Sequence, residues 1–303
     1  MRLDKWYLDA VFPDGTVWFG CRARLGLWKC PAIQWACGRE VLPNGQGREV
    51  SRLGWKEWTE PGLVNGQWVW RGPDGFHARW EPSGPGADCA LASDDSLRVR
   101  WNCLAPKAAV TRMNSDEMGK AADASAAGQP RGAGRALRAR RGGQGTARPA
   151  FFAPVRDALR ASAVSRGLGY VEHLRIETDR PDLPFRQLWW GRAHAGESSL
   201  VWIRWGRGRE LSLLLENGAQ VNGKLETFSK GGARVRTEHG EWETGSGHPL
   251  CDRDARRSFP RWLVWLARGM APSRELKMAG PARLRTASGD YTGSGVWEEV
   301  RWA

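Results

Sequence analysis

A single carboxylate, Glu172, interrupts an apolar and aromatic row of the sequence. The residues that share its face at the two-residue period of a β-strand are Leu168, Tyr170, Leu174 and Ile176. Burial among apolar side chains disfavours the charged form of a carboxyl group and raises its pKa. If this face points inward, the row predicts a neutral carboxylic acid that can donate a proton, with Tyr170 holding the carboxyl or positioning a water molecule.

Tryptophans follow this row in two further β-type runs, 188–190 and 200–205, which are joined by a polar segment containing Gly196. Strands of this kind can curl around one cavity and point the acid into an aromatic lining. The electron-rich face of an indole stabilises a cation by about 1–2 kcal/mol in a dry site. The candidate substrate-binding residues are Trp189, Trp190, Arg192, Trp202 and Trp205.

Two arginines offer a second interpretation of Glu172. Arg192 shares a face with Trp190, and Arg204 shares a face with Trp202. Either guanidinium could pair with Glu172, which would lower the pKa of the carboxyl and leave a buried ion pair without a catalytic role. At most individual positions, core packing is the ordinary role of a tryptophan.

The elements that would position these residues are short strands. Among the 303 residues, 38 Gly and 17 Pro separate short apolar runs at turn-like intervals, and helical periodicity is rare. Residues 5–25 indicate a hairpin around the turn Pro13-Asp14-Gly15. Residues 258–270 fit a helix and a strand alike. A faint similarity between the two halves predicts two related β units, so the fold class is expected to be mainly β.

The positive charge of the chain is concentrated in one low-complexity segment. Residues 112–166 contain eleven Arg or Lys and four Asp or Glu, which is +7 of the formal net charge of +13. This segment has too few large apolar residues to offset the entropy of ordering it. We expect a disordered basic insertion at 112–166 between β domains at 1–111 and 167–303. RNA binding by the insertion is the less favoured interpretation, so nucleic acid is not an expected partner.

Other site classes find little support in the sequence. The six cysteines form no CxxC pair and no Cys/His cluster with zinc spacing, and there is no GxSxG, HExxH or P-loop motif. We therefore expect neither a metal nor another cofactor. The first residues are unlike a signal peptide, and no apolar run is long enough to cross a membrane. We expect a cytoplasmic protein with free thiols, and we allow for peripheral membrane association for access to a lipophilic substrate.

Several short segments together resemble one protein family. They are Lys5–Asp9 with the following Asp14-Gly15, Gly169–Leu174, Leu183-Pro184, Trp190–Arg192 and Ser199–Ile203. These segments resemble the lipocalin-like superfamily of carotenoid 1,2-hydratases (hydroxyneurosporene synthases), which includes tocopherol-cyclase-like and AttH-like proteins. The resemblance covers residues 5–25, 95–111 and 167–225.

The resemblance implies two lipocalin-type, calycin-like β-barrels packed side by side, with a hydrophobic ligand at or between them. In the enzymes of this family an acidic residue protonates an isoprenoid double bond, and water or an internal hydroxyl traps the cation. Carried onto this chain, the acid is Glu172. The chain departs from the family in having Glu172-His173 in place of an Asp-His pair, and in its Arg-rich insertion.

The combined prediction is a hydratase or cyclase that acts on a hydrophobic isoprenoid- or carotenoid-type alkene in a tryptophan-lined pocket. Glu172 and Tyr170 are its predicted catalytic residues. The expected partner is a hydrophobic small molecule. A non-catalytic lipid- or terpenoid-binding protein is the alternative.

Overall fold

A computed structural model describes most of the chain outside the basic segment. The described residues are 1–26, 32–54, 59–93, 96–113, 166–179, 183, 185–206, 210–228, 232–258 and 273–302. Most of the expected insertion, residues 114–165, and the ambiguous segment from residue 259 onward lie outside the described residues.

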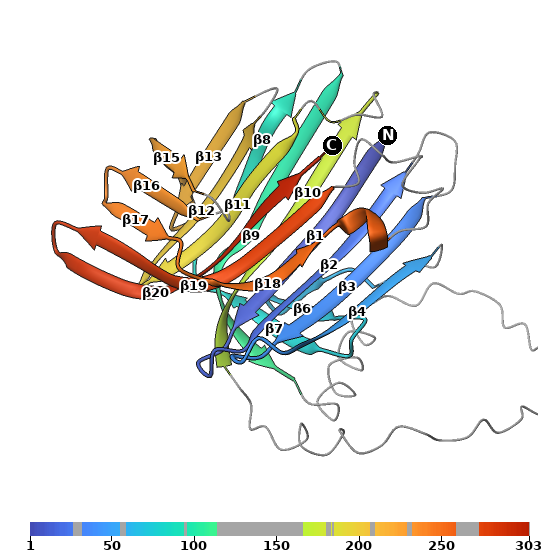
Figure 1. The fold of residues 1–303 in the computed structure, drawn as a ribbon, viewed down its shortest axis with the longest axis horizontal. Coiled ribbons are helices and arrows are strands. Elements are labelled where there is room, and N and C mark those ends of the chain that lie inside the picture. The colour runs from blue at the N-terminus through green and yellow to red at the C-terminus, as the bar shows by residue number, and fades with distance from the viewer. Residues whose placement is uncertain are drawn as a thin grey trace, which may run out of the picture.

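The described residues form two ten-stranded antiparallel sheets, which are side by side in Figure 1. The first sheet contains β1 (Arg2–Val11), β2 (Val17–Gly26), β3 (Ile33–Val41), β4 (Gly47–Gly54), β5 (Gly62–Val64), β6 (Gln67–Arg71), β7 (His77–Pro82), β8 (Ala87–Ser93), β9 (Leu97–Arg112) and β10 (Arg166–Thr178). The second sheet contains β11 (Gln187–Ala195), β12 (Ser198–Gly206), β13 (Leu211–Glu216), β14 (Ala219–Gln220), β15 (Gly223–Thr227), β16 (Ala233–Thr237), β17 (Glu241–Thr244), β18 (His248–Arg253), β19 (Arg274–Thr286) and β20 (Gly289–Arg301). A short 3-10 helix, Ala255–Ser258, follows β18.

The two sheets repeat one topology. The first has the strand order β4-β3-β2-β1-β10-β9-β7-β6-β5, with β8 also paired to β9. The second has the same order with every strand number raised by ten. Each sheet is strongly curled and forms a half-barrel. The mainly β class and the two related units expected from the sequence are therefore confirmed.

Residue pairing shows which positions of the two sheets are equivalent. Tyr7 on β1 lies opposite Glu172 on β10, and Trp190 on β11 lies opposite Glu298 on β20. By the same pairing, Asp9 is equivalent to Arg192. Tyr7 and Trp190 also contact each other, with ring centroids 5.1 Å apart. The equivalent strands β1 and β11 therefore meet where the two sheets face each other.

The first sheet extends past the boundary expected at residue 167. Strand β10 pairs with β1 and β9 along its whole length, and Arg166 lies opposite Thr111 at the start of the β9–β10 hairpin. The change of sequence pattern near residue 112 thus marks a connection between two neighbouring strands of one sheet. The first unit includes Glu172 and ends after Thr178, and the second begins at Gln187.

Alternation along the strands builds three large apolar cores and one small cluster around Ile33 among the described residues. One face of the first sheet packs on itself around Trp18 and Trp80, and one face of the second packs on itself around Trp202 and Trp242. The opposite faces of both sheets share a third core, which includes Tyr170 and Trp190 together with apolar residues of β2, β9, β12 and β13. This shared core holds the two half-barrels together by burying apolar surface.

Candidate active site

A mainly apolar pocket lies between the two sheets, in the shared core. Its volume is about 220 Å³, which is room for roughly fifteen water-sized groups and therefore for an organic ligand. Its apolar walls come from Leu3, Phe19, Leu25, Trp35, Leu174 and Ile176 in the first sheet, and from Leu188, Trp190, Ile203, Trp205, Val300 and Trp302 in the second. The lining also contains a small set of charged groups, of which Glu172 is one.

Glu172 reaches this pocket from the centre of the first sheet. Its strand, β10, lies between β1 and β9, and Glu172 pairs with Tyr7 on one side and Cys103 on the other. The register between β9 and β10 shifts twice near Glu172, between Gly169 and Val171, where Pro106 lies on β9, and between Val171 and Glu172. A proline is tolerated in a sheet interior mainly at such bulges, and a bulge re-aims nearby side chains.

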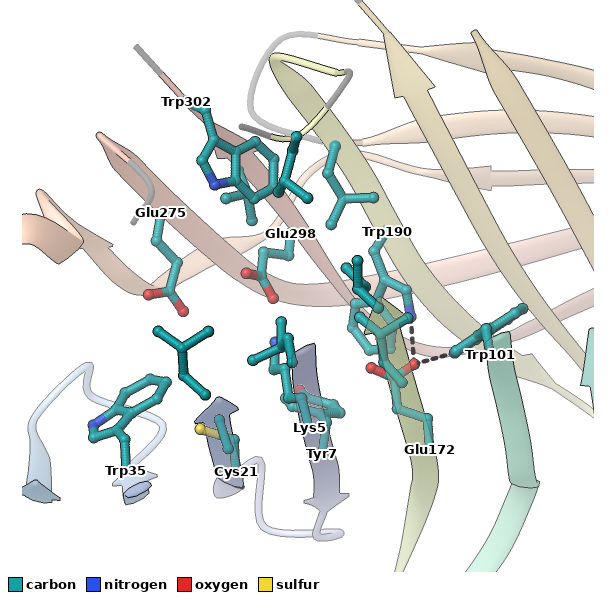
Figure 2. A pocket seen from close by; sticks show the side chains of 18 of the residues that line it. Lys5, Tyr7, Cys21, Trp35, Trp101, Glu172, Trp190, Glu275, Glu298 and Trp302 are labelled. Carbon is teal, nitrogen blue, oxygen red and sulfur yellow. Dashed lines mark hydrogen bonds between the residues drawn. The ribbon is translucent and has the colours of Figure 1, made fainter. Parts of the chain in front are cut away.

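Three neutral donors converge on one oxygen of Glu172 within the described part of the chain. Oε2 accepts hydrogen bonds from the indole N–H of Trp101 at 2.7 Å, the hydroxyl of Tyr170 at 2.8 Å and the indole N–H of Trp190 at 3.1 Å. Figure 2 shows both indoles directed at this oxygen, with the other carboxyl oxygen turned away from them. Because Oε2 is occupied by donors, a proton on Glu172 must sit on Oε1.

The pKa of Glu172 is raised above its ordinary value. Burial is the largest cause, because only 7% of the residue is exposed. The field of Lys5 and the hydrogen bonds from Trp101 and Tyr170 act in the opposite direction but do not cancel the effect of burial. Glu172 is therefore disposed to carry a proton on the oxygen that is free of donors.

A second carboxylate in the pocket has the opposite character. Glu298, the equivalent of Glu172 in the second sheet, forms a buried ion pair with Lys277, with 2.7 Å between Nζ and Oε2. Burial alone raises the pKa of Glu298, but the ammonium groups of Lys277 and Lys5 outweigh it and lower the pKa below its ordinary value. The ammonium of Lys277 also lies 4.2 Å from the ring centroid of Tyr7. Of these two carboxyls of the pocket, Glu172 favours its proton and Glu298 is ionised.

Three of the residues predicted from the sequence meet at this site. Glu172, Trp190 and Trp205 line the pocket, and the indole of Trp205 stacks on Phe185 with ring centroids 4.1 Å apart. Tyr170 is fully buried behind Glu172 and is not part of the pocket lining. Its hydroxyl holds the carboxyl, so Tyr170 is a positioning residue.

Trp202 and Trp189 lie elsewhere. The side chain of Trp202 is buried in the separate core of the second sheet, where its ring covers Gly191. A Cβ atom at Gly191 would lie 2.2 Å from the indole, so this glycine is what makes room for the ring. Trp189 points to the face opposite Trp190, where the guanidinium of Arg204 lies 5.5 Å from its ring centroid. Neither tryptophan lines the pocket, because neighbouring residues of a strand face opposite sides of the sheet.

Arg192 forms an ion pair with Asp9. It contacts neither the pocket nor Glu172. Its Nε donates to Asp9 Oδ1 at 2.8 Å and to Oδ2 at 3.1 Å, and its Nη2 also donates to Oδ1. Both side chains are completely buried. Arg192 and Asp9 occupy equivalent positions in the two sheets, so this ion pair joins β1 to β11. Arg192 thus lies outside the pocket lining and is held by Asp9.

Sequence reasoning missed four charged residues of the pocket: Lys5, Glu275, Lys277 and Glu298. The signal for Lys5 was present, because Lys5 stands between Leu3 and Tyr7 at the two-residue period that singled out Glu172. Lys277 and Glu298 are likewise charges within apolar strands, but their pairing across β19 and β20 is visible only in the structure.

Among the residues that the structure describes, no group of three or more His, Cys, Asp or Glu side chains is arranged to hold a metal ion. Within the same residues, no helix has the length and apolar character needed to cross a bilayer.

Solved structures share this arrangement over nearly the whole chain. Kievitone hydratase from Nectria haematococca has a TM-score of 0.51 at 9% identity, covering 98% of this chain and 88% of that one. An AttH-type protein from Nitrosomonas europaea has a TM-score of 0.52 at 12% identity, covering 100% and 93%. CghA has a TM-score of 0.50 at 11% identity, covering 100% and 88%. The fold is lipocalin-like.

Similarity at such low identity establishes the fold alone. No protein-family model matches the sequence, and no curated protein matches it significantly. The lipocalin-like fold expected from the short sequence segments is therefore confirmed, and the carotenoid hydratase family stays a prediction. In this lipocalin-like fold the apolar pocket lies between the two half-barrels.

Proposed function

We propose that the protein is a hydratase or cyclase that protonates an alkene of a hydrophobic, isoprenoid-type substrate, with Glu172 as the acid. The observation that carries the proposal is the burial and hydrogen bonding of one carboxyl group, which favour its protonated form. Glu172 is buried at the pocket wall with a raised pKa, and three donors on Oε2 leave Oε1 as the site of its proton. A carotenoid is one substrate of the required apolar character.

In the hydratase form, the reaction balances with the alkene and one water molecule as its only reactants. The alkene π bond takes the proton from Oε1, which forms a C–H bond and leaves a carbocation beside the Glu172 carboxylate. The three donors on Oε2 stabilise the developing negative charge, as in other preorganised sites. Water then adds to the cation and returns a proton to the carboxylate. In a cyclase, an internal nucleophile of the substrate takes the place of water.

A non-catalytic carrier of lipids or terpenoids is the second candidate. The mainly apolar walls of the pocket favour it, because such walls bind a hydrophobic molecule without any chemistry. The two candidates differ in whether the proton of Glu172 is transferred to the bound molecule. One protein of the same fold, kievitone hydratase, is named as a hydratase, and this example favours the enzymatic candidate.

Incubation with isoprenoid alkenes in isotopically labelled water tests the proposal. We expect the wild-type protein to convert farnesol or geranylgeraniol, dispersed in detergent, into a product that contains deuterium from D₂O at the protonated carbon. Glu172→Gln should lower this turnover by roughly 10²–10⁴-fold, the usual contribution of a positioned general acid. Ligand affinity should change little, because glutamine keeps the size of the side chain.

The matched control is Glu177→Gln, which changes a half-buried glutamate on the same strand, outside the pocket lining, and should leave turnover intact. Unchanged turnover in Glu172→Gln would contradict the role of Glu172. Wild-type protein that binds both alkenes without incorporating deuterium would favour the carrier.

A further inference from the structure

One cation of the pocket has no partner among the described residues. The ammonium of Lys277 is paired with Glu298, and the carboxylate of Glu275 accepts a hydrogen bond of 3.1 Å from Arg253. Within the described part of the chain, by contrast, Lys5 Nζ forms no hydrogen bond and no ion pair. Its nearest ring is Tyr7, whose centroid is 6.0 Å away.

Lys5 is placed to face a ligand. It lies on β1 with Leu3 and Tyr7 on the same face, and all three line the pocket. Figure 2 shows Lys5 and Tyr7 rising from β1 below Glu298, which comes from the opposite sheet. Lys5 pairs with Leu174, two residues beyond Glu172, and diagonal neighbours of this kind lie roughly 7–8 Å apart on one face of an antiparallel sheet.

Lys5 is cationic near neutral pH although it lies in a largely apolar cavity. Burial alone lowers the pKa of its ammonium, but the carboxylate of Glu298, the thiol of Cys21 and the carboxyl of Glu172 act in the other direction, and the pKa is raised. The surrounding carboxylates thus stabilise the charge of Lys5, but no described group accepts a hydrogen bond from its Nζ, so the donors of the ammonium are open to a ligand.

We propose that Lys5 binds an anionic oxygen of the ligand, so that the natural substrate is a hydrophobic acid and not a pure hydrocarbon. This inference rests on the pocket of the proposed function and specifies what that pocket accepts. The apolar walls bind the body of the molecule, and the Lys5 ammonium fixes its anionic end on the same sheet face as Glu172. Hydrogen bonds that involve a charged group are stronger than neutral ones and direct the orientation of a ligand.

Binding of an anion at Lys5 has a consequence for Glu172. The positive field of Lys5 lowers the pKa of Glu172 in the empty pocket. A ligand anion on Lys5 neutralises this field, so the pKa of Glu172 rises when the substrate is bound. The substrate thereby helps its own proton donor to keep the proton until it is transferred.

Fluorescence titration with cis-parinaric acid and its methyl ester tests the proposal. The two probes have the same polyene chain and differ only in the anionic carboxylate. We expect wild-type protein to bind the acid roughly ten- to a hundredfold more tightly than the ester, the range of one hydrogen bond to a charged group. Lys5→Met should abolish this preference and leave the affinity for the ester unchanged, while Lys5→Arg should keep the preference.

Lys224→Met is the matched control, because Lys224 is an exposed lysine of the second sheet. It should retain the wild-type preference for the acid. Equal affinities of wild-type protein for the two probes, binding of neither probe, or an unchanged preference in Lys5→Met would overturn the proposal. The same titration in Glu172→Gln separates this inference from the catalytic proposal, because the preference for the acid should persist where turnover is lost.

Discussion

Glu172 and Glu298 occupy equivalent positions in the two sheets, yet their surroundings push their pKa values in opposite directions. Glu172 is buried among neutral donors, whereas Glu298 pairs with the ammonium of Lys277. Divergent environments of two titratable groups in one cavity are a recurring sign of separate acid and base roles. The difference arises on the partner strand, where Cys103 of β9 is replaced by Lys277 of β19.

The acid role fixes the direction of the pH dependence. Turnover requires protonated Glu172, so it should be full at low pH and fall as pH rises through the raised pKa of this carboxyl. Trp101→Phe removes a donor that stabilises the carboxylate, so the pKa should rise further and the fall should move to higher pH. Trp205→Phe is the control, because Trp205 lines the pocket and donates no hydrogen bond to Glu172. If turnover of Trp101→Phe fell at a lower pH than turnover of the wild-type protein, the account would be contradicted.

Single residues show most clearly which features of the site could be predicted from the sequence. The two-residue period correctly placed Glu172 and Tyr170 on one inward face, because an apolar row with one charge is an unusual local pattern. The same period shows that Trp189 and Trp190 cannot both line one pocket, since they are neighbours on a strand. The partner of Arg192 was beyond sequence reasoning, because Asp9 is 183 residues away and belongs to the other sheet.

At the scale of elements, the buried pair of Asp9 and Arg192 joins β1 to β11. Removing one member leaves the other charge buried alone, which costs about 3–5 kcal/mol of unfolding free energy. We expect a loss of this size for Arg192→Met and for Asp9→Leu in denaturant unfolding. The double variant should be more stable than either single variant, because it leaves neither charge unpaired. Single losses that simply add in the double variant would contradict the assigned partnership.

The hairpins β9–β10 and β19–β20 are equivalent but differ in their connections. Thr286 and Gly289 are joined by two residues, whereas Thr111 and Arg166, which also face each other, are joined by residues 112–165. A long connection between paired strand ends adds closure entropy without being needed for the sheet. The sequence could identify this segment by its composition, but not that it interrupts a single hairpin.

Replacing residues 114–165 with two glycines should therefore preserve the fold. The resulting four-residue loop keeps Met113, whose amide donates to the carbonyl of His77, and four-residue hairpin loops are common. We expect the unfolding free energy to increase by about 2 kcal/mol from the shorter loop. Binding of cis-parinaric acid should be unchanged. Loss of folding or of probe binding would show that the segment has a structural role.

At the scale of the whole molecule, the site exists because two similar sheets meet. The outer wall of each half-barrel is closed by its own core, and the two remaining faces form the pocket. Glu172 and Lys5 come from the first sheet, whereas Trp190 and the pair of Lys277 with Glu298 come from the second. The sequence predicted the two units from weak internal similarity, but the cavity between them depends on pairing between distant segments.

The most direct test of the central claim is the protonation state of Glu172, measured as a function of pH by infrared difference spectroscopy between wild-type protein and Glu172→Gln. The account predicts that wild-type protein has a protonated-carboxyl C=O band that is absent from the variant and persists to a higher pH than the band of an ordinary glutamic acid. Loss of this band at the pH of an ordinary glutamic acid, or at a lower one, would contradict it.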